Sequence, residues 1–219
     1  MAAAVSISPL HRPLKSISPK ERPVKPPEGS SPNGPVGDII IPRRRTTATE
    51  GKPTMIVVLA GPPISGKTTV GSILADRLGV PFVDIDDRVR DRTGLSIPEV
   101  FDRMGEESFR RMEAELLRET LLGESAVVGV GGGCLLSPTN LELAADRAVV
   151  VTLLADDDVI LSRWREGDRP LAASRSDLAE LLSRRREHYL SLPNPVLTNG
   201  LSPEEVAERI VGVLKGPED

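Results

Sequence analysis

The chain has 219 residues, of which 39% are hydrophobic and 2% aromatic, and its formal net charge is −4. This length suits one domain with a single core, and the shortage of aromatic residues makes that core aliphatic. The only cysteine, Cys134, excludes an internal disulfide and a cysteine-based zinc cluster, and it favours a reducing compartment. No apolar segment approaches the ~20 residues that a membrane-spanning helix needs, so we expect no membrane partner.

Residues 1–53 differ in composition from the rest of the chain. They hold ten of the 20 prolines, and nine lysines and arginines against four acidic residues give them a net charge of +5. Without a periodic apolar face such a segment cannot form a core, which predicts a disordered tail; an organelle transit peptide is the alternative. The predicted domain spans residues 54–216. Because the rest of the chain carries a charge of −9, we expect no nucleic-acid partner.

Residues 61–69 read Gly-Pro-Pro-Ile-Ser-Gly-Lys-Thr-Thr and fit the phosphate-loop pattern G-x-x-x-x-G-K-[ST]. A predicted strand over residues 55–60 precedes them and a predicted helix over residues 69–78 follows, so backbone N–H groups and the helix dipole should point at one phosphate. Lys67 would reach the β- and γ-phosphates of ATP, and the Thr68 hydroxyl would ligate Mg²⁺. A chance match on an ordinary strand, loop and helix is the alternative. The predicted ATP-binding residues here are Gly61, Ile64, Ser65, Gly66, Lys67, Thr68 and Thr69.

Further along the chain, short β-branched runs alternate with helical stretches. Strands are predicted at residues 80–83, 126–130, 148–154 and 195–197. Ser96 and Ser202 are each followed by a proline and a glutamate, in the order typical of a helix start. Strands separated by helical crossovers predict an α/β fold with a five-stranded parallel sheet sandwiched between helices. Ligands of such sheets bind at the carboxyl ends of the strands.

Two motifs follow predicted strands directly. Asp84 and Asp86 come after the second strand, and if the chain is still extended there, both carboxylates point the same way beside the phosphate loop. One could hold the water shell of a metal while the other accepts a proton from a substrate hydroxyl. Gly131-Gly-Gly133, which we call the glycine triplet, follows the third strand and would let a ligand approach the backbone. Helix capping by the aspartates and a tight turn at the glycines are the alternatives.

Three groups of arginines complete the candidate residues. Arg110 and Glu113 lie three apart on a predicted helix over residues 106–122, so the carboxylate can orient the guanidinium toward an anion. An ordinary surface ion pair is the alternative. Arg169 lies in a segment that contains glycine and proline, where it could close over ATP and neutralise the charge on a transferred phosphate. Residues 184–186 are all arginine and precede Tyr189.

Together these segments resemble the shikimate kinase family, whose members share a phosphate loop and five further motifs in a set order. The resemblance covers about residues 55–215 and omits the tail. Six spaced motifs are far more specific than a phosphate loop alone. The matching segments are Lys67-Thr68, Asp84-Ile-Asp86, Phe109-Arg-Arg-Met-Glu113, Gly131-Gly-Gly133, Arg169-Pro-Leu171 and Arg185-Arg-Glu-His-Tyr189.

The resemblance implies a P-loop kinase fold with a lid segment, and ATP-dependent phosphorylation of shikimate to shikimate 3-phosphate in aromatic amino acid and chorismate biosynthesis. It also implies a role for each matching position. Asp86 would hydrogen-bond the reacting hydroxyl and act as its base, and Gly132 would contact shikimate through its backbone. Arg110 and Arg185 would bind the shikimate carboxylate between them. Thr68 and Asp84 would bind Mg²⁺. Lys67 and Arg169 would stabilise the γ-phosphoryl group of ATP.

Ile64 departs from the family pattern, which usually has glycine at the fourth position of the loop. A β-branched residue cannot easily take a positive φ. We therefore expect the loop to use a negative φ here or to bind ATP less tightly.

Three rival functions stay open. A gluconate-type kinase shares the phosphate loop, although two arginines suited to a carboxylate and the glycine triplet favour shikimate. A GTPase is suggested only by residues 91–94, Asp-Arg-Thr-Gly, which fall at a predicted helix end, and the base-reading motif Asn-Lys-x-Asp is absent from the sequence. A catalytically weak binding module derived from a kinase is the third. We expect a monomer in the cytoplasm, or in a plastid if residues 1–53 are a transit peptide.

Overall fold

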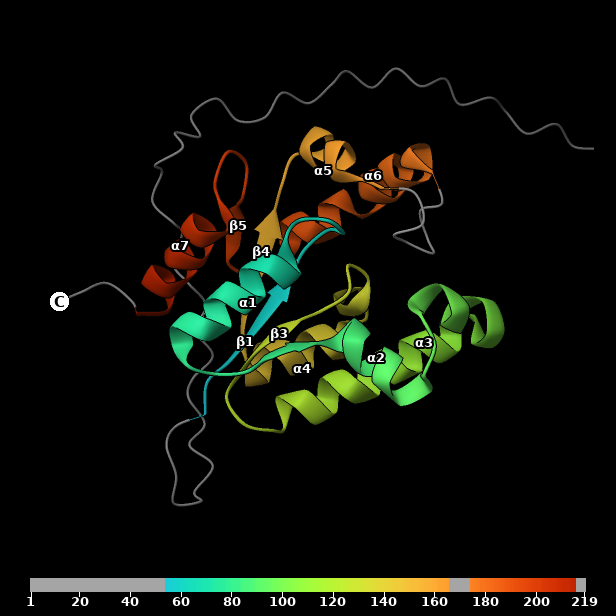
Figure 1. Cartoon of the computed structure of the whole chain (residues 1–219), viewed down its shortest axis with the longest axis horizontal. Coiled ribbons are helices and arrows are strands. Elements are labelled where there is room, and N and C mark those ends of the chain that lie inside the picture. The colour runs from blue at the N-terminus through green and yellow to red at the C-terminus, as the bar shows by residue number, and fades with distance from the viewer. Residues whose placement is uncertain (1–53, 166–173, 216–219) are drawn as a thin grey trace, which may run out of the picture. The chain divides into compact units, whose positions relative to one another are not determined.

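A five-stranded parallel sheet forms the centre of the domain, with helices on both faces (Figure 1). The computed structural model describes residues 54–165 and 174–215, and all of these fall within one compact unit. The order of the strands across the sheet is β2-β3-β1-β4-β5, and every neighbouring pair is parallel. The strands are β1 (Ile56–Ala60), β2 (Phe82–Asp84), β3 (Ala126–Gly129), β4 (Val149–Leu154) and β5 (Pro195–Leu197).

Helices connect consecutive strands, as parallel pairing requires. Those on either side of β2 are α1 (Lys67–Leu78), α2 (Ile85–Thr93) and α3 (Ile97–Leu121). Those after β3 are a short 3-10 turn, η1 (Cys134–Leu136), and α4 (Pro138–Arg147). Those after β4 and β5 are α5 (Asp157–Arg163), α6 (Arg175–Ser191) and α7 (Pro203–Lys215).

The two faces of the sheet pack against different helices, because successive side chains of a strand point to opposite faces. In β1, Val57 and Leu59 join a core that includes residues of α1 and α7. Val58 and Ala60 join the opposite core, which includes residues of α2, α3 and α4. All five β1 residues are buried, so this strand lies in the middle of the domain, between the two cores.

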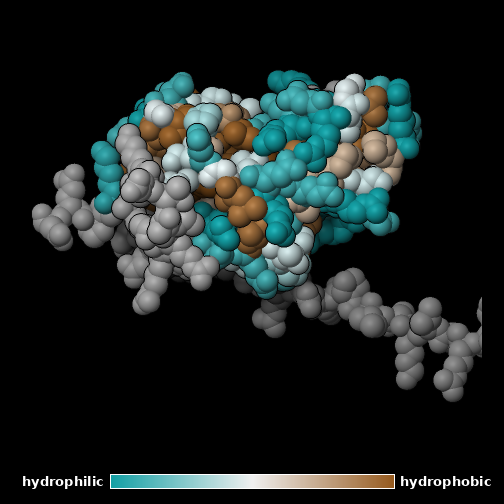
Figure 2. Space-filling view, turned by 90° about the horizontal axis from the view of Figure 1, so that it is seen from below, coloured by the Kyte–Doolittle hydropathy of each residue, from teal (hydrophilic) through white to brown (hydrophobic). Residues whose placement is uncertain are grey.

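A third apolar cluster lies outside these two cores. Its buried members are Ile160 of α5 and Leu178, Leu181 and Leu182 of α6. We call it the α5–α6 cluster. On the face of the molecule that Figure 2 shows, hydrophobic residues lie in separate areas between polar ones.

The predicted α/β architecture, the five parallel strands and the helix starts are confirmed. Ser96 caps α3 in a reciprocal capping box with Glu99, and Ser202 and Glu205 exchange the same pair of hydrogen bonds at the start of α7. The predicted second strand began two residues early, since β2 starts at Phe82. The helix predicted over residues 106–122 is the second part of α3, which is broken at Gly105 with φ 78°.

Within residues 54–165 and 174–215, no helix has both the length and the apolar composition needed to cross a bilayer. The predicted tail over residues 1–53 and the predicted lid residue Arg169 lie outside the described residues.

Candidate active site

The phosphate loop occupies the turn between β1 and α1, as the sequence pattern predicts. Gly61 and Gly66 have φ 125° and 97°, which glycine adopts at little cost. A side chain at position 61 would lie 2.2 Å from the carbonyl oxygen of Leu153, so this position also requires glycine for space. The Lys67 ammonium folds over the loop and donates hydrogen bonds to the Gly61 and Pro62 carbonyl oxygens at 3.1 and 2.6 Å.

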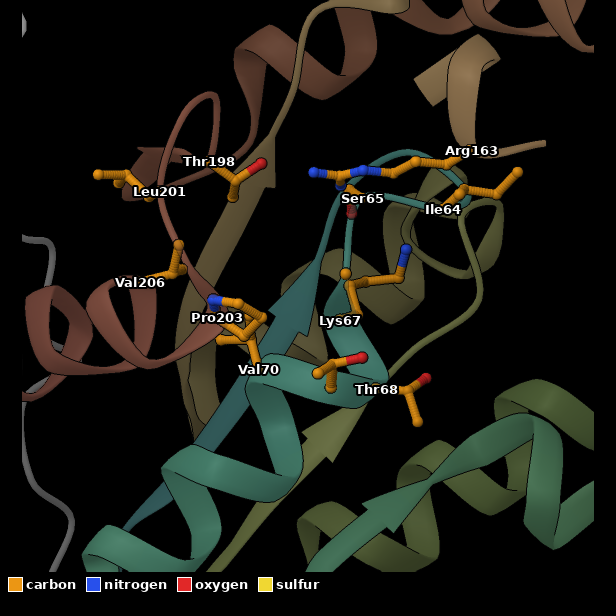
Figure 3. Close-up of a pocket in the computed structure, with 12 residues that line it drawn as sticks. Ile64, Ser65, Lys67, Thr68, Val70, Arg163, Thr198, Leu201, Pro203 and Val206 are labelled. Atoms are coloured by element: carbon orange, nitrogen blue, oxygen red, sulfur yellow. The ribbon is translucent and has the colours of Figure 1, made fainter. Parts of the chain in front are cut away.

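A pocket of about 400 Å³ opens beside this loop and the first turn of α1 (Figure 3). The loop contributes backbone and side chains to it, and the α1 N-terminus directs the N–H groups of its first turn and its dipole toward it. The geometry is that of an anion site at a helix start. We call this cavity the loop pocket, and the predicted residues that line it are Ile64, Ser65, Gly66, Lys67, Thr68 and Thr69.

Ile64 has φ 62°, which excludes the negative φ, one of the two alternatives expected here; weaker ATP binding, the other, stays a prediction. The left-handed conformation costs about 1–2 kcal/mol for an ordinary L-residue, and branching at Cβ adds to the crowding. The side chain packs against the α5–α6 cluster, as those of Leu161 and Trp164 also do. Burial of its apolar surface therefore offsets part of the backbone cost.

Other residues of the pocket lining were not predicted from the sequence. Arg163 is the last residue of α5, while Thr198 and Leu201 follow β5. Pro203 and Val206, from the start of α7, also line the pocket. Their position at the carboxyl ends of β4 and β5 was the available signal, because ligands of parallel sheets bind there.

Asp84 lies between the phosphate loop and α2. Its Oδ2 accepts a hydrogen bond from the Thr68 hydroxyl at 3.1 Å, and its Oδ1 accepts the backbone N–H of Asp86 at 2.9 Å. Asp84 is therefore the N-cap of α2, and the chain turns into the helix at Ile85. The expected extended alternation of Asp84 and Asp86 is not what orients them; the cap points Asp84 at Thr68 and leaves Asp86 in the first helical turn.

The paired oxygens of Thr68 and Asp84 suit Mg²⁺, which takes oxygen ligands and is usually held by one or two carboxylates together with phosphates and water. Over the part of the chain that the structure describes, no three His, Cys, Asp or Glu residues come together as a protein-only metal cage. The donor set therefore fits a metal that is shared with a phosphate ligand.

Charged side chains crowd around the glycine triplet after β3. An added Cβ at Gly131 would lie 2.8 Å from Glu113 Oε1 and 3.3 Å from Asp86 Oδ1, and one at Gly133 would lie 2.7 Å from the Arg110 guanidinium. The triplet thus needs its bare backbone for a close approach of side chains. We call Asp86, Arg110 and Glu113 the charged cluster.

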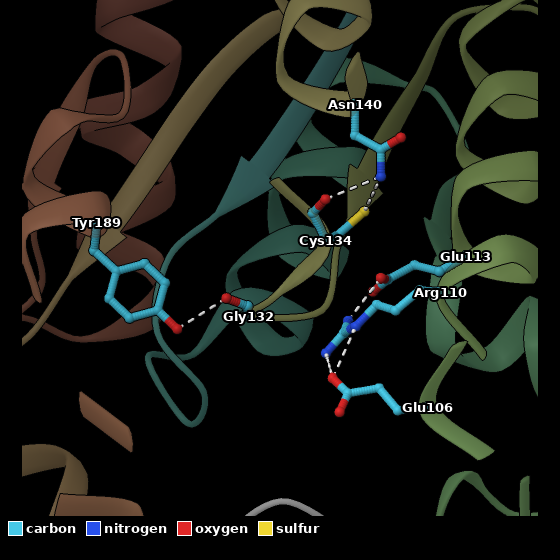
Figure 4. Close-up of polar contacts among 7 residues, drawn as sticks. All are labelled: Glu106, Arg110, Glu113, Gly132, Cys134, Asn140 and Tyr189. Carbon is cyan, nitrogen blue, oxygen red and sulfur yellow. Dashed lines mark hydrogen bonds and ion pairs between the residues drawn. The ribbon is translucent and has the colours of Figure 1, made fainter. Parts of the chain in front are cut away.

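The phosphate loop reaches the same place. An added Cβ at Gly132 would lie 3.1 Å from Pro63 Cδ, and the Tyr189 hydroxyl donates a hydrogen bond to the Gly132 carbonyl oxygen at 2.8 Å (Figure 4). Tyr189, which is buried, thereby fixes the triplet to α6, a role that the sequence reasoning did not assign. The loop pocket and the charged cluster are therefore neighbours.

The Arg110 and Glu113 side chains form a partly buried ion pair rather than a surface one. Arg110 donates to Glu113 Oε2 at 2.7 Å, and Glu106 accepts from the same guanidinium at 3.2 Å (Figure 4). The Glu113 side chain is 1% exposed, and its other oxygen, Oε1, has no hydrogen-bond partner among the described atoms. An acceptor in this state is ready to receive a hydrogen bond from a ligand hydroxyl.

Burial raises the pKa of Glu113 to about 7, although Arg110 acts in the opposite direction. The Asp86 carboxylate raises the same pKa further, while Arg185 lowers it. These influences place the charges of Asp86, Arg110 and Arg185 around one buried carboxylate. The predicted substrate-binding residues therefore converge, although they come from α2, α3 and α6.

Two other sequence features have structural explanations. Residues 91–94, the weak GTPase signal, are the end of α2, and Gly94 is its left-handed C-cap. Cys134 is buried, which raises the pKa of its thiol well above the usual value, and Asn140 donates to its backbone carbonyl at 3.0 Å (Figure 4). Asn140 thus supports the turn that follows the glycine triplet.

Comparison with known proteins places this arrangement in a family. A shikimate kinase from Geobacter sulfurreducens is 40% identical over 163 residues, which is 73% of this chain and 90% of that protein. The solved structure of a shikimate kinase from Acinetobacter baumannii in complex with shikimate aligns with a TM-score of 0.70 at 32% identity, over 74% of this chain and 93% of that one.

The shikimate kinase from Aquifex aeolicus aligns with a TM-score of 0.66 at 35% identity, over 74% of this chain and 97% of that one. The sequence model of the family described as "Shikimate kinase" matches residues 63–215, which include most of the phosphate loop, the glycine triplet and the charged cluster. This chain belongs to the shikimate kinase family.

Proposed function

We propose that the chain transfers the γ-phosphoryl group of ATP to a hydroxyl of shikimate and forms shikimate 3-phosphate, in the route to chorismate and aromatic amino acids. The observation that carries this proposal is the junction at the glycine triplet, where Pro63 of the phosphate loop and Tyr189 approach Gly132 and the charged cluster approaches Gly131 and Gly133. Phosphoryl transfer needs the phosphate donor and the acceptor hydroxyl in line and in contact. A phosphate site next to two arginines and two carboxylates provides that contact for a small hydroxylated acid.

The loop pocket is the ATP site in this proposal. Backbone N–H groups of the loop bind the phosphates at the α1 N-terminus, and Lys67 moves from its own carbonyls to the β- and γ-phosphates. Arg163 and Pro203 lie on different sides of the pocket beyond the loop, where the base of the nucleotide would stack between a guanidinium and an apolar ring (Figure 3). The scarcity of aromatic residues is consistent with such a binding mode.

Thr68 and Asp84 are the residues that would hold Mg²⁺, since their oxygens are 3.1 Å apart beside the loop. Bound there, the metal would neutralise charge on the β- and γ-phosphate oxygens during transfer. The cap formed by Asp84 fixes its carboxylate, so this ligand needs little reorganisation before ATP binds.

The charged cluster and Arg185 are the shikimate site. Arg110, held by Glu106 and Glu113, and Arg185 bind the substrate carboxylate, and Gly132 contacts the ring through its backbone. Asp86 accepts the proton of the reacting hydroxyl as that hydroxyl attacks phosphorus. Glu113 Oε1, buried and directed toward Gly131, accepts a hydrogen bond from another hydroxyl of the ring.

Arg169 supplies the remaining positive charge to the γ-phosphoryl group and also contacts ATP, a role that remains a prediction because this residue lies outside the described ranges. We assign the kinase domain to residues 54–216 and expect it to act as a monomer. We place its reaction in the cytoplasm, where ATP and Mg²⁺ are available, or in a plastid if residues 1–53 are a transit peptide.

The direct test is a coupled assay of ADP release with the purified full chain, ATP and Mg²⁺, in which shikimate and gluconate are compared as acceptors. We expect release that depends on shikimate and no response to gluconate. ADP release with gluconate alone would support a gluconate-type kinase. Tight ATP binding without turnover of either acid would support a binding module instead.

A further inference from the structure

Ile64 stands out among the loop residues because it adopts a conformation that its side chain disfavours. In the described ranges, Ile64 and Asn194 are the residues other than glycine with a positive φ. Asparagine tolerates that region, whereas a β-branched residue rarely enters it. Something in the fold must therefore hold Ile64 in place.

The side chain of Ile64 supplies such a restraint. It packs on the α5–α6 cluster, whose central residues Ile160 and Leu178 are fully buried. Neither of the two sheet cores includes Ile64, so this contact joins the phosphate loop to a separate helix pair. Arg186 of α6 and Asp157 of α5, which are 3.0 Å apart, hold the pair together by an additional ion pair.

The helix pair carries groups that line both halves of the site. Arg163 at the end of α5 lines the loop pocket, and Figure 3 shows it at the same end of the pocket as Ile64. Tyr189 of α6 fixes the glycine triplet through its bond to Gly132. If the loop is held against α5 and α6, its N–H groups keep a fixed position relative to Arg163 in the loop pocket.

We propose that Ile64 is a positioning residue for the nucleotide: its side chain braces the phosphate loop against α5 and α6 and holds the loop in the conformation that binds ATP. The inference rests on the proposed ATP site. It goes beyond that site because it assigns a function to a side chain at a position where the loop pattern asks only for backbone. Trp164, packed on the same cluster, reports on this contact.

The test compares Ile64→Val, Ile64→Gly and Ile64→Ala in the full chain, with titration of a non-hydrolysable ATP analogue followed by Trp164 fluorescence and calorimetry. Valine keeps the branched side chain and should bind like the wild type. Glycine loses the brace but relieves the backbone, and alanine loses the brace and keeps most of the backbone cost. We expect the Kd of the analogue to rise about threefold for glycine and about tenfold for alanine.

The KM for shikimate should stay within about twofold in all three variants, because the charged cluster is untouched. The Trp164 response to the analogue should shrink in the glycine and alanine variants and remain in the valine variant. Ile73→Ala is the matched control. Ile73 of α1 is partly buried against the sheet core that includes residues of α1 and α7, and it does not line the loop pocket. It should lower the melting temperature and leave the Kd unchanged.

Each other outcome has a definite meaning. If Ile64→Gly binds the analogue as tightly as the wild type or more tightly, the Ile64 side chain does not support nucleotide binding and the proposal is refuted. Equal losses for the analogue and for shikimate, or for Ile73→Ala as well, would point to general destabilisation and also refute it. A wild-type chain that fails to bind the analogue would overturn the ATP site itself.

Discussion

The phosphate loop takes its binding groups from one short stretch of chain, whereas the charged cluster takes its groups from α2 and α3 and is held beside Arg185 and Tyr189 of α6. The loop offers mainly backbone N–H groups, and its shape depends on a few positive φ values. The charged cluster offers side chains that packing brings so close to the glycine triplet that a Cβ added at Gly131 or Gly133 would lie about 3 Å from them. The first region depends on backbone conformation, and the second depends on tertiary contacts and burial.

This difference implies that the two halves should fail separately. Changes in the charged cluster should leave nucleotide binding intact, because the phosphates are held by backbone N–H groups of the phosphate loop, which is a different segment of the chain. Changes in the loop should leave the acceptor site intact for the same reason.

Asp86→Asn should keep the fold and nucleotide binding and lose most turnover, because the amide cannot accept the proton of the attacking hydroxyl. Loss of a general base typically lowers kcat by about 10²–10⁴-fold. Steady-state kinetics measures the turnover, and calorimetric titration with the ATP analogue measures nucleotide binding. Asp87→Asn is the matched control, since Asp87 is exposed on the same helix and pairs with Arg90. Near-normal turnover in Asp86→Asn would refute the assignment of the base.

Arg110→Ala should raise the KM for shikimate and change the KM for ATP little. A hydrogen bond to a charged group contributes about 1.5–3 kcal/mol, which corresponds to roughly 10- to 150-fold in KM. Arg111→Ala serves as the control, because Arg111 is the next residue of α3 and is exposed. Equal weakening of shikimate and ATP in Arg110→Ala would contradict the separation of the two halves.

Glu113→Gln should change how stability depends on pH. The pKa of Glu113 is raised from 4.5 to about 7 in the folded protein, so the folded state holds this proton more tightly than the unfolded chain. Its contribution to the free energy of unfolding is therefore fully present below about pH 4.5 and is lost as pH rises through about 7. Over that range the wild type should lose about 2–3 kcal/mol relative to the glutamine variant.

Denaturant unfolding of both proteins at a series of pH values measures this difference, and Glu107→Gln, an exposed change on the same helix, is the control. Parallel stability curves for the wild type and Glu113→Gln would show that Glu113 is charged at neutral pH in the folded state.

Deletion of residues 1–53 should have the smallest effect. Their composition offers no core, so the kinetic constants for ATP and shikimate should stay within about twofold and the melting temperature should hardly change. Kinetics and thermal unfolding of the chain that begins at Thr54 provide the measurement. An inactive or unfolded product would show that the tail is part of the kinase domain.

Local patterns in the sequence were sufficient for the architecture and for the residues of the loop. Alternation of β-branched runs with helices predicts the parallel sheet, and the pattern around Lys67 predicts a phosphate site after β1 because both depend on residues close in the chain. The caps at Ser96 and Ser202 were predictable for the same reason. The resemblance to shikimate kinases added the charged cluster and Arg185, which no local pattern identifies as one site.

Only the tertiary structure decided how the halves meet. It placed Glu113 Oε1 beside Gly131, tied Tyr189 to Gly132, and completed the loop pocket with Arg163 and Pro203, since each contact joins elements far apart in sequence. The fold also selected among alternatives that the sequence left open. Asp84, the last residue of β2, is directed by its cap on α2. Ile64 has a positive φ, and part of that cost is offset because its partly buried side chain packs on the α5–α6 cluster.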